Sequence, residues 1–377
     1  MKRVLFLIDD LNCGGAEKSL INLLRNLSSQ KYFIDIFLIV NKGEYIKEVP
    51  SNVNIKTIIN TNIKNKKIAN IVIKIKLKLF RFYLYRFNNI SSYKKLVKNI
   101  YDVEIAFLEG MSTKIIANSK NLKSIKIAWV HTDLSKNHWY EKVYKNNNEE
   151  RNSYKRFNKI IAVSEDAKKG FKKILGNDFN LNTINNIIDS YDILRKSNEY
   201  KVTIDCFTIC TVGNLKSVKG YERLIKVHAK LIKNGFYHKL IIIGEGSERL
   251  KLEKLISKLD VCNSIELKGQ IENPYPYIKN SNLYVCSSFT EGFPLSVAEA
   301  IILEKPIVAT KCTGTNELLG NGEYGIIIKN SEEGLYEGIS RIINNQYLMH
   351  EYEAKTKKRA EMFDKLKIIE QLESVLD

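Results

Sequence analysis

Short apolar runs alternate with longer amphipathic stretches along almost the whole chain. This alternation is typical of repeated β-α-β units, and it predicts parallel sheets covered by helices. In the first half, we expect strands at residues 4–8, 34–40, 55–59, 103–108, 125–130 and 160–163. In the second half, we expect them at residues 207–212, 240–243, 265–267, 283–286, 307–309 and 325–328. Each half therefore has enough strands for its own doubly wound sheet, and the predicted fold class is α/β.

A polar segment without a sustained period, residues 185–201, separates the two halves. The chain has 377 residues, and a domain usually holds about 100 to 200, so two hydrophobic cores are expected. We predict an N-terminal domain at 1–187, a linker at 188–203 and a C-terminal domain at 204–355. Residues 356–377 are helical in pattern, and they either cap the second domain or cross back to the first.

Two features of the composition concern the compartment. No stretch approaches the roughly 20 uninterrupted apolar residues of a spanning helix, and the first apolar run ends at Asp9 and Asp10, too early for a targeting signal. The cysteines are scattered without a CxxC pair, which favours buried, reduced thiols over zinc ligands or disulfides. They are Cys13, Cys206, Cys210, Cys262, Cys286 and Cys312. Reduced thiols indicate the cytoplasm.

The formal net charge of +18 indicates an anionic partner, and nucleic acid, anionic lipid and phosphorylated substrates all qualify. Residues 64–98 hold many of the cations and no acidic residue. Lys74, Lys76 and Lys78 alternate with apolar residues, which is a strand period, whereas Lys74, Lys78 and Arg81 share a helical face. We favour a helix, because a β-α-β unit needs a crossover before the strand at 103–108.

Three interpretations of this basic segment stay open. A basic amphipathic helix with aromatic residues is suited to lie on an anionic membrane. A solvated crossover helix, whose aromatic residues pack on the sheet, fits the pattern equally well. A nucleic-acid groove is the weaker alternative, since no nucleic-acid-binding motif accompanies the segment.

Two places in the first half are candidate ligand sites. Gly14 and Gly15 follow the first strand and open a helix, whose free N–H groups and positive dipole end favour a phosphate. The turn is not the GxGxxG of a dinucleotide dehydrogenase, and a tight turn without a ligand is the alternative. His131 follows the strand at 125–130, at the sheet edge where α/β proteins bind ligands. Its imidazole can bond or protonate a substrate oxygen, although a lone histidine is as often an ordinary polar residue.

The second half begins with a strand, a loop bounded by Gly213 and Gly220, and an amphipathic helix. Lys219 stands just before that helix, where an ammonium group and a helix N-terminus together can hold a diphosphate. Lys216 can assist it. In a chain this rich in lysine, a solvated loop lysine is the alternative.

The strongest signal is a pair of glutamates eight positions apart. Glu291 lies in the loop after the strand at 283–286, and Glu299 lies in a helix that we expect to begin near Leu295. Both carboxylates can face one ligand and accept hydrogen bonds from sugar or ribose hydroxyls, while the helix turn between them faces phosphate. Exposed glutamates on an ordinary helix are the alternative.

With these residues in place, the chain resembles the retaining glycosyltransferases of family 4, which have the GT-B fold of two facing Rossmann-like domains with a central cleft. Glu291 and Glu299 match the family's E-x7-E motif, and EGFPLSVAEA around them is similar to it. Further similar segments are GGAE at 14–17, VSE at 163–165, NIID at 186–189 and IIIGEGSERLKLEKL at 241–255. The similarity extends along nearly the whole chain and is closer in the second half.

The resemblance implies a role for each position. Lys219 and the helix turn near Ser296 would hold the donor diphosphate, Glu299 would bond the ribose, and Glu291 would contact the donor sugar. His131 would lie near the reacting face of the sugar, so His131 and Glu291 are the expected catalytic residues. The expected donor-binding set is Gly14, Gly15, Asn214, Lys219, Glu291, Gly292, Phe293, Pro294, Leu295, Ser296 and Glu299.

One position departs from the family. Asn214 stands where an arginine usually pairs with the lysine on the diphosphate, and Lys216 is the candidate substitute, so diphosphate affinity or donor choice can differ. The family is metal-independent, and no metal-binding cluster is visible in the sequence, so we expect neither a metal nor a cofactor. Attack on the face from which the diphosphate leaves, with a phosphate oxygen taking the acceptor's proton, would need no protein nucleophile.

These observations predict an enzyme that moves a hexose or N-acetylhexosamine from a nucleotide sugar to a lipid-linked or surface-polysaccharide acceptor. UDP is the expected nucleotide by the family's preference, and the expected location is the cytoplasm, peripheral to the inner face of the membrane. No nucleic-acid partner is expected. The alternatives are a GT-B sugar-nucleotide epimerase or phosphorylase, and a non-catalytic subunit of a glycan-assembly complex. Intact Lys219, Glu291 and Glu299 favour the transferase.

Overall fold

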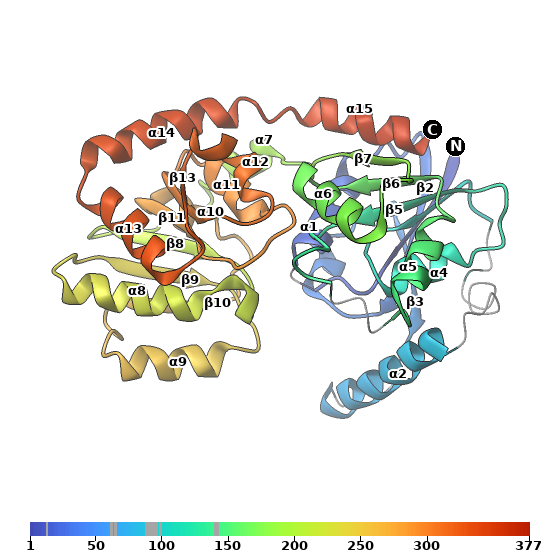
Figure 1. The fold of residues 1–377 in the computed structure, drawn as a ribbon, viewed down its shortest axis with the longest axis horizontal. Helices are drawn as coiled ribbons and strands as arrows, with labels where there is room; N and C mark the ends of the chain where they lie inside the picture. Colours follow the sequence, from blue (N-terminus) through green and yellow to red (C-terminus); the bar gives the residue numbers. More distant parts are fainter. Residues whose placement is uncertain (13, 61–62, 64–65, 87–96, 98–99, 139–142) are drawn as a thin grey trace. The chain divides into compact units, whose positions relative to one another are not determined.

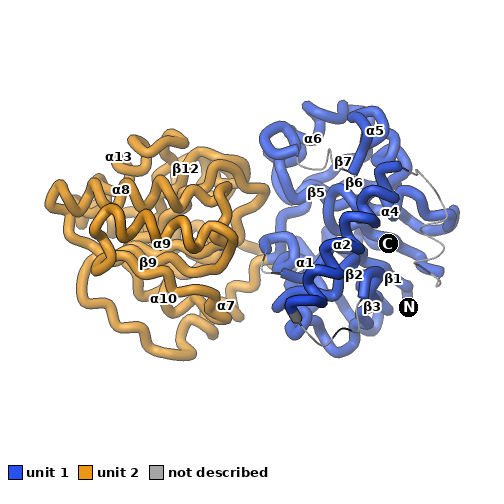
Figure 2. Tube along the Cα trace, turned by 90° about the horizontal axis from the view of Figure 1, so that it is seen from below, with its two compact units in different colours: residues 1–187, 366–377 blue, residues 188–365 orange. Residues whose placement is uncertain are grey.

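The computed structural model describes residues 1–12, 14–60, 63, 66–86, 97, 100–138 and 143–377. Cys13 and most of the predicted basic segment beyond residue 86 lie outside the described residues. The chain divides into two compact units: unit 1 is Met1–Ile187 with Leu366–Asp377, and unit 2 is Ile188–Lys365 (Figure 2). Each unit holds a parallel sheet flanked by helices (Figure 1). The predicted α/β class is confirmed.

The sheet of unit 1 has seven parallel strands in the order β3-β2-β1-β4-β5-β6-β7. Residues 4–8 of the central strand β1 have no exposed surface, as expected for a strand that is covered on both faces. The six predicted runs correspond to β1 to β6, whereas β7 was not predicted. The strands are β1 (Lys2–Ile8), β2 (Tyr32–Val40), β3 (Asn54–Ile59), β4 (Val103–Ala106), β5 (Ile125–Val130), β6 (Lys159–Ala162) and β7 (Leu181–Thr183).

Helices connect these strands as crossovers. The described ones are α1 (Gly15–Asn26), η1 (Glu44–Glu48), α2 (Lys66–Arg86), α4 (Met111–Ala117), α5 (Asn147–Tyr154) and α6 (Glu165–Leu175). Ser164 caps α6, since its hydroxyl accepts a hydrogen bond from the backbone N–H of Ala167 at 3.1 Å. The strand-like alternation in the basic segment does not prevent a helix, and the helical interpretation is confirmed for residues 66–86.

The C-terminal helix α15 (Lys365–Leu376) packs on unit 1. Leu372, Val375 and Leu376 are buried, and Glu373 pairs with Lys31 at 2.6 Å. Lys159, at the start of β6, donates to the backbone oxygen of Val375 at 2.8 Å. The end of the chain is therefore held by both apolar and polar contacts.

The sheet of unit 2 has six parallel strands in the order β10-β9-β8-β11-β12-β13. All six had been predicted. They are β8 (Thr208–Val212), β9 (Lys239–Ile243), β10 (Ile265–Gly269), β11 (Leu283–Cys286), β12 (Ile307–Thr310) and β13 (Ile326–Ile328). The helices are α7 (Ser190–Lys196), η3 (Ser217–Lys219), α8 (Tyr221–Lys233), α9 (Arg249–Lys258), α10 (Tyr275–Asn280), α11 (Leu295–Ile302), α12 (Thr315–Leu318), η4 (Gly320–Gly322), α13 (Glu332–Ile343) and α14 (Gln346–Ala360).

Two details of unit 2 differ from expectation. The segment expected as a linker contains α7, which Asp189 caps by accepting from the N–H of Asp192 at 3.1 Å and which packs on α10 and α11. Its seven residues are too few to show a helical period. Cys206 and Cys262 are exposed rather than buried, because they lie just outside the strands. Cys210, Cys286 and Cys312 are buried free thiols as predicted.

Candidate active site

Both sheets have a switch point, where the strand order reverses: between β8 and β11 in unit 2, and between β1 and β4 in unit 1. The loops that follow two such strands diverge to opposite faces, and the crevice between them is where open α/β sheets bind ligands. In unit 2, Lys219 follows β8 and Glu291 follows β11. The topology therefore explains how residues 72 positions apart meet.

Lys219 and Glu291 form an ion pair, with Nζ 2.7 Å from Oε1. The hydroxyl of Ser288 donates to the same carboxylate oxygen at 2.5 Å. Burial by itself lowers the pKa of Lys219, but the charge of Glu291 reverses this and holds the pKa above its ordinary value. The lysine is therefore a fixed cation, and the two side chains expected at the diphosphate and at the sugar touch each other.

The backbone around Lys219 is held by the strand end opposite. Ser287 Oγ donates to the carbonyl of Lys219 at 2.8 Å, and Arg223 donates to the carbonyl of Ser287 through Nε at 3.0 Å. Gly220 has φ of +67°, and a Cβ there would lie 2.2 Å from the Ser287 carbonyl oxygen. Only glycine fits this close approach. Gly220 therefore allows the backbone next to Lys219 to pack directly against Ser287, and this contact sets the position of Lys219.

Glu299 lies on α11, and its side chain is buried, with 4% exposure. Tyr275 of α10 approaches it, the hydroxyl lying 3.5 Å from Oε1. A buried carboxylate is retained only where polar partners satisfy it, so this position is unlike that of an exposed helix glutamate. The alternative of a solvated residue is therefore excluded for Glu299.

The segment between the two glutamates is shaped by packing. Phe293 and Leu295 are buried, with 8% and 6% exposure, so their side chains anchor the loop and leave its backbone to face a ligand. Gly314, at φ of +76°, lies against it, and a Cβ there would be 2.5 Å from the Gly292 oxygen. Pro294 is the N-cap of α11, and no side chain caps the helix. Its first N–H groups are donors of the kind that bind phosphate.

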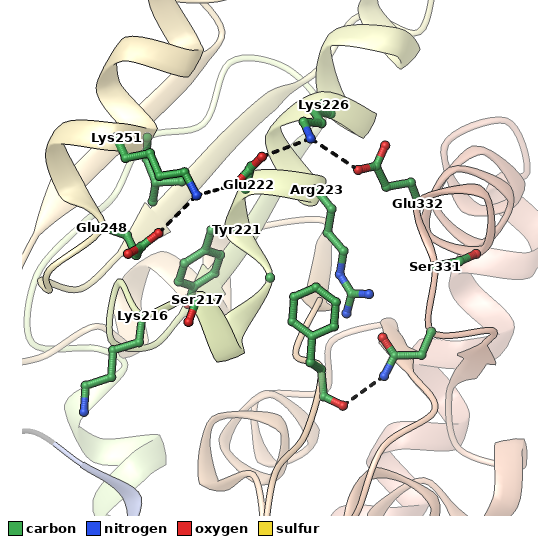
Figure 3. Close-up of a pocket in the computed structure, with 14 residues that line it drawn as sticks. Lys216, Ser217, Tyr221, Glu222, Arg223, Lys226, Glu248, Lys251, Ser331 and Glu332 are labelled. Carbon is green, nitrogen blue, oxygen red and sulfur yellow. Dashed lines mark hydrogen bonds and ion pairs between the residues drawn. The ribbon is translucent and has the colours of Figure 1, made fainter. Parts of the chain in front are cut away.

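The two remaining predicted positions of the β8 loop differ in exposure. Asn214 is half-buried, whereas Lys216 is exposed. Lys216 lines the edge of a separate pocket of about 380 Å³, beside α8, α9 and the start of α13. Figure 3 shows Arg223 directed into this pocket and Lys216 at its margin. Neither Lys219 nor the two glutamates of the motif line it, so this hollow is not the predicted donor site.

In unit 1, Gly14 and Gly15 open α1 after β1, as expected. A Cβ on Gly14 would lie 2.0 Å from Glu17 Oε2, whereas a Cβ on Gly15 would meet nothing within 4 Å. The contact at Gly14 is with the end of a flexible side chain, and the backbone there is extended, with φ of −129°, so the turn itself does not require glycine. Gly15 is not required by any described neighbour, which leaves space above the helix N-terminus for a ligand.

His131 lies at the carboxyl end of β5, where it was expected. Its ring lies 4.9 Å from that of Phe107 and hydrogen-bonds the Phe107 backbone, and the side chain is buried with 8% exposure. Burial lowers the pKa of His131 to about 3, so the imidazole is neutral at ordinary pH. Of the two predicted actions, bonding a substrate oxygen fits this state, and protonating it does not.

Two carboxyl groups that follow the neighbouring strands β1 and β4 were not singled out in the sequence. Glu109, in the turn after β4, is fully buried and accepts from the backbone N–H of His131 at 2.7 Å. Asp9, at the end of β1, accepts from Ser112 at 3.2 Å. Desolvation raises the pKa of each to about 7, against the hydrogen bonds that lower it. No local sequence motif marks Asp9 or Glu109 as site residues. Both lie just after a strand, and that position is a signal by which they could have been found.

None of the helices in the described part of the chain is long and apolar enough to cross a membrane. Within the same residues, no three His, Cys, Asp or Glu side chains gather in a way that could hold a metal ion.

Residues 192–361 match the family model for glycosyl transferases group 1. This stretch lies within unit 2 and contains Lys219, Glu291 and Glu299. A similarity to glycosyltransferases, as expected from the sequence, is therefore found over the unit that carries the two glutamates.

Several curated proteins with similar sequences are named as glycosyltransferases. An uncharacterized glycosyltransferase of Haemophilus influenzae is 31% identical over 220 residues, which are 58% of this chain and 61% of that protein. An N-acetylgalactosamine-N,N'-diacetylbacillosaminyl-diphospho-undecaprenol 4-alpha-N-acetylgalactosaminyltransferase of Campylobacter jejuni is 32% identical over 185 residues, which are 48% of this chain and 50% of that protein. The chain spans about half the length of the curated relatives it matches.

Solved structures resemble the fold over its whole length. HepE of Anabaena, in complex with UDP and glucose, has a TM-score of 0.76 at 19% identity, covering 100% of this chain and 99% of that one. A variant of S. aureus TarM, in complex with Fondaparinux, alpha-GlcNAc-glycerol and UDP, has a TM-score of 0.77 at 17% identity, covering 100% of both chains. The expected pair of Rossmann-like domains is confirmed.

Proposed function

We propose that the chain is a glycosyltransferase that works in the synthesis of polysaccharides or other cell-surface glycans. The observation that carries this proposal is the contact between Lys219 and Glu291 at the switch point of a sheet, with Glu299 buried on the helix that follows, all within the matched segment. The named relatives, and the relatives' structures that hold UDP, support it.

Unit 2 is proposed to bind the nucleotide sugar. Lys219 would hold the diphosphate together with the N-terminal N–H groups of α11, and Glu299 would accept from the ribose hydroxyls. Glu291, which now pairs with Lys219, would turn to the hydroxyls of the donor sugar when phosphate takes its place. Unit 1 would then provide the acceptor side, while its Gly14, Gly15 and His131 would contact the donor. UDP is the proposed nucleotide.

The proposed reaction retains configuration and needs no metal. The acceptor oxygen attacks the anomeric carbon on the face from which the diphosphate leaves, the bond from that carbon to the phosphate oxygen breaks, and the acceptor's proton passes to that oxygen. Lys219 and the helix N-terminus would stabilise the negative charge on the diphosphate. His131, being neutral, would hydrogen-bond a sugar hydroxyl rather than supply a proton.

Enzyme assays test this proposal. Purified protein with EDTA is offered UDP-glucose, UDP-N-acetylglucosamine and UDP-N-acetylgalactosamine, with a polyprenyl-diphosphate-linked sugar as acceptor, and UDP release is measured. We expect acceptor-dependent release, an α-linked product by NMR, and loss of activity in Lys219→Ala. Lys254→Ala, which alters an exposed lysine of α9 in the same unit, is the matched control.

Other results would identify the alternatives. Conversion of one UDP-sugar into another without acceptor would indicate an epimerase, and release that requires inorganic phosphate would indicate a phosphorylase. A folded protein that binds UDP and turns over none of these donors would indicate a non-catalytic subunit.

The acceptor is proposed to be lipid-linked and reached at the inner face of the cell membrane. On α2, apolar residues spaced three or four apart form an exposed stripe: Ile68, Ile71, Ile75, Leu79 and Phe82, with exposures of 51%, 58%, 54%, 62% and 62%. A second set, with Leu84 buried and Ile73, Leu77 and Phe80 partly buried, packs on the core of unit 1. The exposed stripe is therefore additional to what the fold requires.

The charge on α2 favours an anionic lipid surface as the partner. The helix has no acidic residue, and Lys67, Lys74, Lys78 and Arg81 are exposed. Each basic residue near an anionic bilayer adds about 1 kcal/mol of attraction, and the apolar stripe would enter the headgroup region.

Liposome flotation tests this surface. We expect binding to vesicles that contain phosphatidylglycerol, weaker binding to phosphatidylcholine vesicles, and loss of binding in Ile75→Ser/Leu79→Ser. Leu250→Ser removes an equally exposed leucine from unit 2 and should leave binding unchanged. Failure of the wild type to bind anionic vesicles at low salt would refute the membrane proposal and leave the transferase proposal standing.

A further inference from the structure

One carboxylate oxygen in unit 1 receives three hydrogen bonds from two consecutive residues. Glu109 Oε1 accepts from the backbone N–H of His131 at 2.7 Å, from the backbone N–H of Thr132 at 2.9 Å and from Thr132 Oγ1 at 3.0 Å. Glu109 itself is fully buried, in the turn between β4 and α4. A buried charged group bonded in this way cannot move without leaving several polar groups unpaired.

These bonds are made where the chain leaves the sheet. β5 ends at Val130, so the N–H groups of the next two residues lie beyond the strand. Glu109 takes both of them, from a loop that follows the neighbouring strand β4. The Glu109 side chain thereby takes the place of a neighbouring strand as hydrogen-bond acceptor, and it fixes the backbone at His131.

The ring of His131 is held from the same turn. Phe107 packs on the imidazole at 4.9 Å between ring centroids, and its backbone bonds the ring. Nε2 of His131 is buried and has no partner among the described residues. Backbone and ring are therefore both set by the segment 107–109, and one ring nitrogen stays available as an acceptor.

We infer that Glu109 is a positioning residue, which sets the backbone and ring of His131 for contact with the donor sugar. This inference rests on the proposed function, and it goes beyond that function by assigning a role to a carboxyl group outside every motif in the sequence. Glu109 acts through His131 and does not itself touch the substrate. Burial, which raises the pKa of Glu109 to about 7, leaves its neutral form accessible as well, so an amide in its place is a fair substitute.

The test is a double-mutant cycle. Glu109→Gln keeps an oxygen that can accept all three bonds, and kcat should stay within about threefold of wild type. Glu109→Asp keeps the charge but withdraws the carboxylate by one methylene, and kcat should fall about as far as in His131→Ala. The double variant Glu109→Asp/His131→Ala should be no slower than His131→Ala alone, because both changes remove the same contact.

The binding of UDP separates this role from damage to the whole fold. Thermal-shift titration should give every variant the wild-type affinity for UDP, because the proposed nucleotide site lies in unit 2.

Additive losses in the cycle, or full activity in Glu109→Asp, would overturn the inference while the transferase proposal stands. A silent His131→Ala would overturn it as well, whereas a wild type without transferase activity would remove the proposed function on which it rests. Thr132→Val, which deletes the third bond to Glu109, should reduce kcat by less than threefold, and a loss as large as that of Glu109→Asp would also contradict it.

Discussion

Replacing Glu291 by glutamine is predicted to tighten the binding of free UDP while slowing transfer. In the structure, the carboxylate holds Lys219 at 2.7 Å, so an incoming diphosphate must displace it. A phosphate oxygen bonded to the same Nζ would lie about 5 Å from the carboxylate. Two unit charges at that distance, in an effective dielectric of about 20, repel each other by about 3 kcal/mol.

Both side chains keep some contact with solvent, at 22% exposure for Lys219 and 13% for Glu291, so we halve that energy to about 1.5 kcal/mol. This corresponds to about a tenfold lower Kd for UDP. Glutamine preserves the size of the side chain and can still accept from Ser288, which isolates the effect of charge. The turnover number should fall, because a neutral amide is a weaker acceptor for the hydroxyls of the donor sugar.

Isothermal titration with UDP and with a UDP-sugar measures the effect. The gain should be smaller for the UDP-sugar, since the sugar loses its own bond to Glu291. Glu337→Gln removes an exposed charge from α13 and should change neither affinity. If Glu291→Gln binds UDP as weakly as wild type or more weakly, the carboxylate does not compete with the diphosphate, and the assignment of Lys219 as its ligand is wrong.

Three further predictions concern unit 2. Glu299→Ala should weaken UDP binding about tenfold, by the loss of a charged acceptor for ribose, and an unchanged thermal shift would exclude that role. Gly220→Ala should lower the free energy of urea unfolding by more than Gly235→Ala. Both glycines have positive φ, but only a Cβ at position 220 would meet another atom, the carbonyl oxygen of Ser287 at 2.2 Å. Equal losses in the two variants would contradict this. Burial lowers the pKa of His228 to about 3 in the folded protein, against about 6.5 in the unfolded chain. The contribution of neutral His228 to the free energy of unfolding is therefore complete above pH 6.5. It is lost as the pH falls toward 3, at about 1.4 kcal/mol per pH unit. The melting temperature of wild type should therefore approach that of His228→Phe between pH 6.5 and 4.5, and a constant difference would exclude the linkage.

The strands were predictable because parallel strands buried on both faces form continuous apolar runs. Residues 4–8 of β1 and the whole of β12 are completely enclosed, and all of these residues except Thr310 are apolar. β7 escaped because it has three residues, Leu-Asn-Thr, at the edge of the sheet, and only Leu181 is buried. An edge strand so short carries no period.

The helix α2 shows why periodicity alone left alternatives. Its apolar residues occupy two faces, one against the core at Leu77 and Leu84 and one exposed at Ile75 and Leu79. Two apolar stripes separated by lysines resemble strand alternation over a short window. Tertiary packing of the inner stripe decides for the helix, and the sequence does not contain that information locally.

The two candidate sites also differ in how they are encoded. In unit 2, Glu291 and Glu299 belong to one loop and the helix that follows it, so a fixed spacing in the sequence records their geometry. In unit 1, Asp9, Glu109 and His131 come one from each of three strand ends, and parallel strands separated by crossovers leave no fixed spacing between them. A motif therefore marks the proposed donor side and none marks the other, although the polar groups of unit 1 are as deeply buried. If unit 1 binds the acceptor, changes of acceptor can arise from single substitutions at its strand ends, without disturbing the segment that holds the donor.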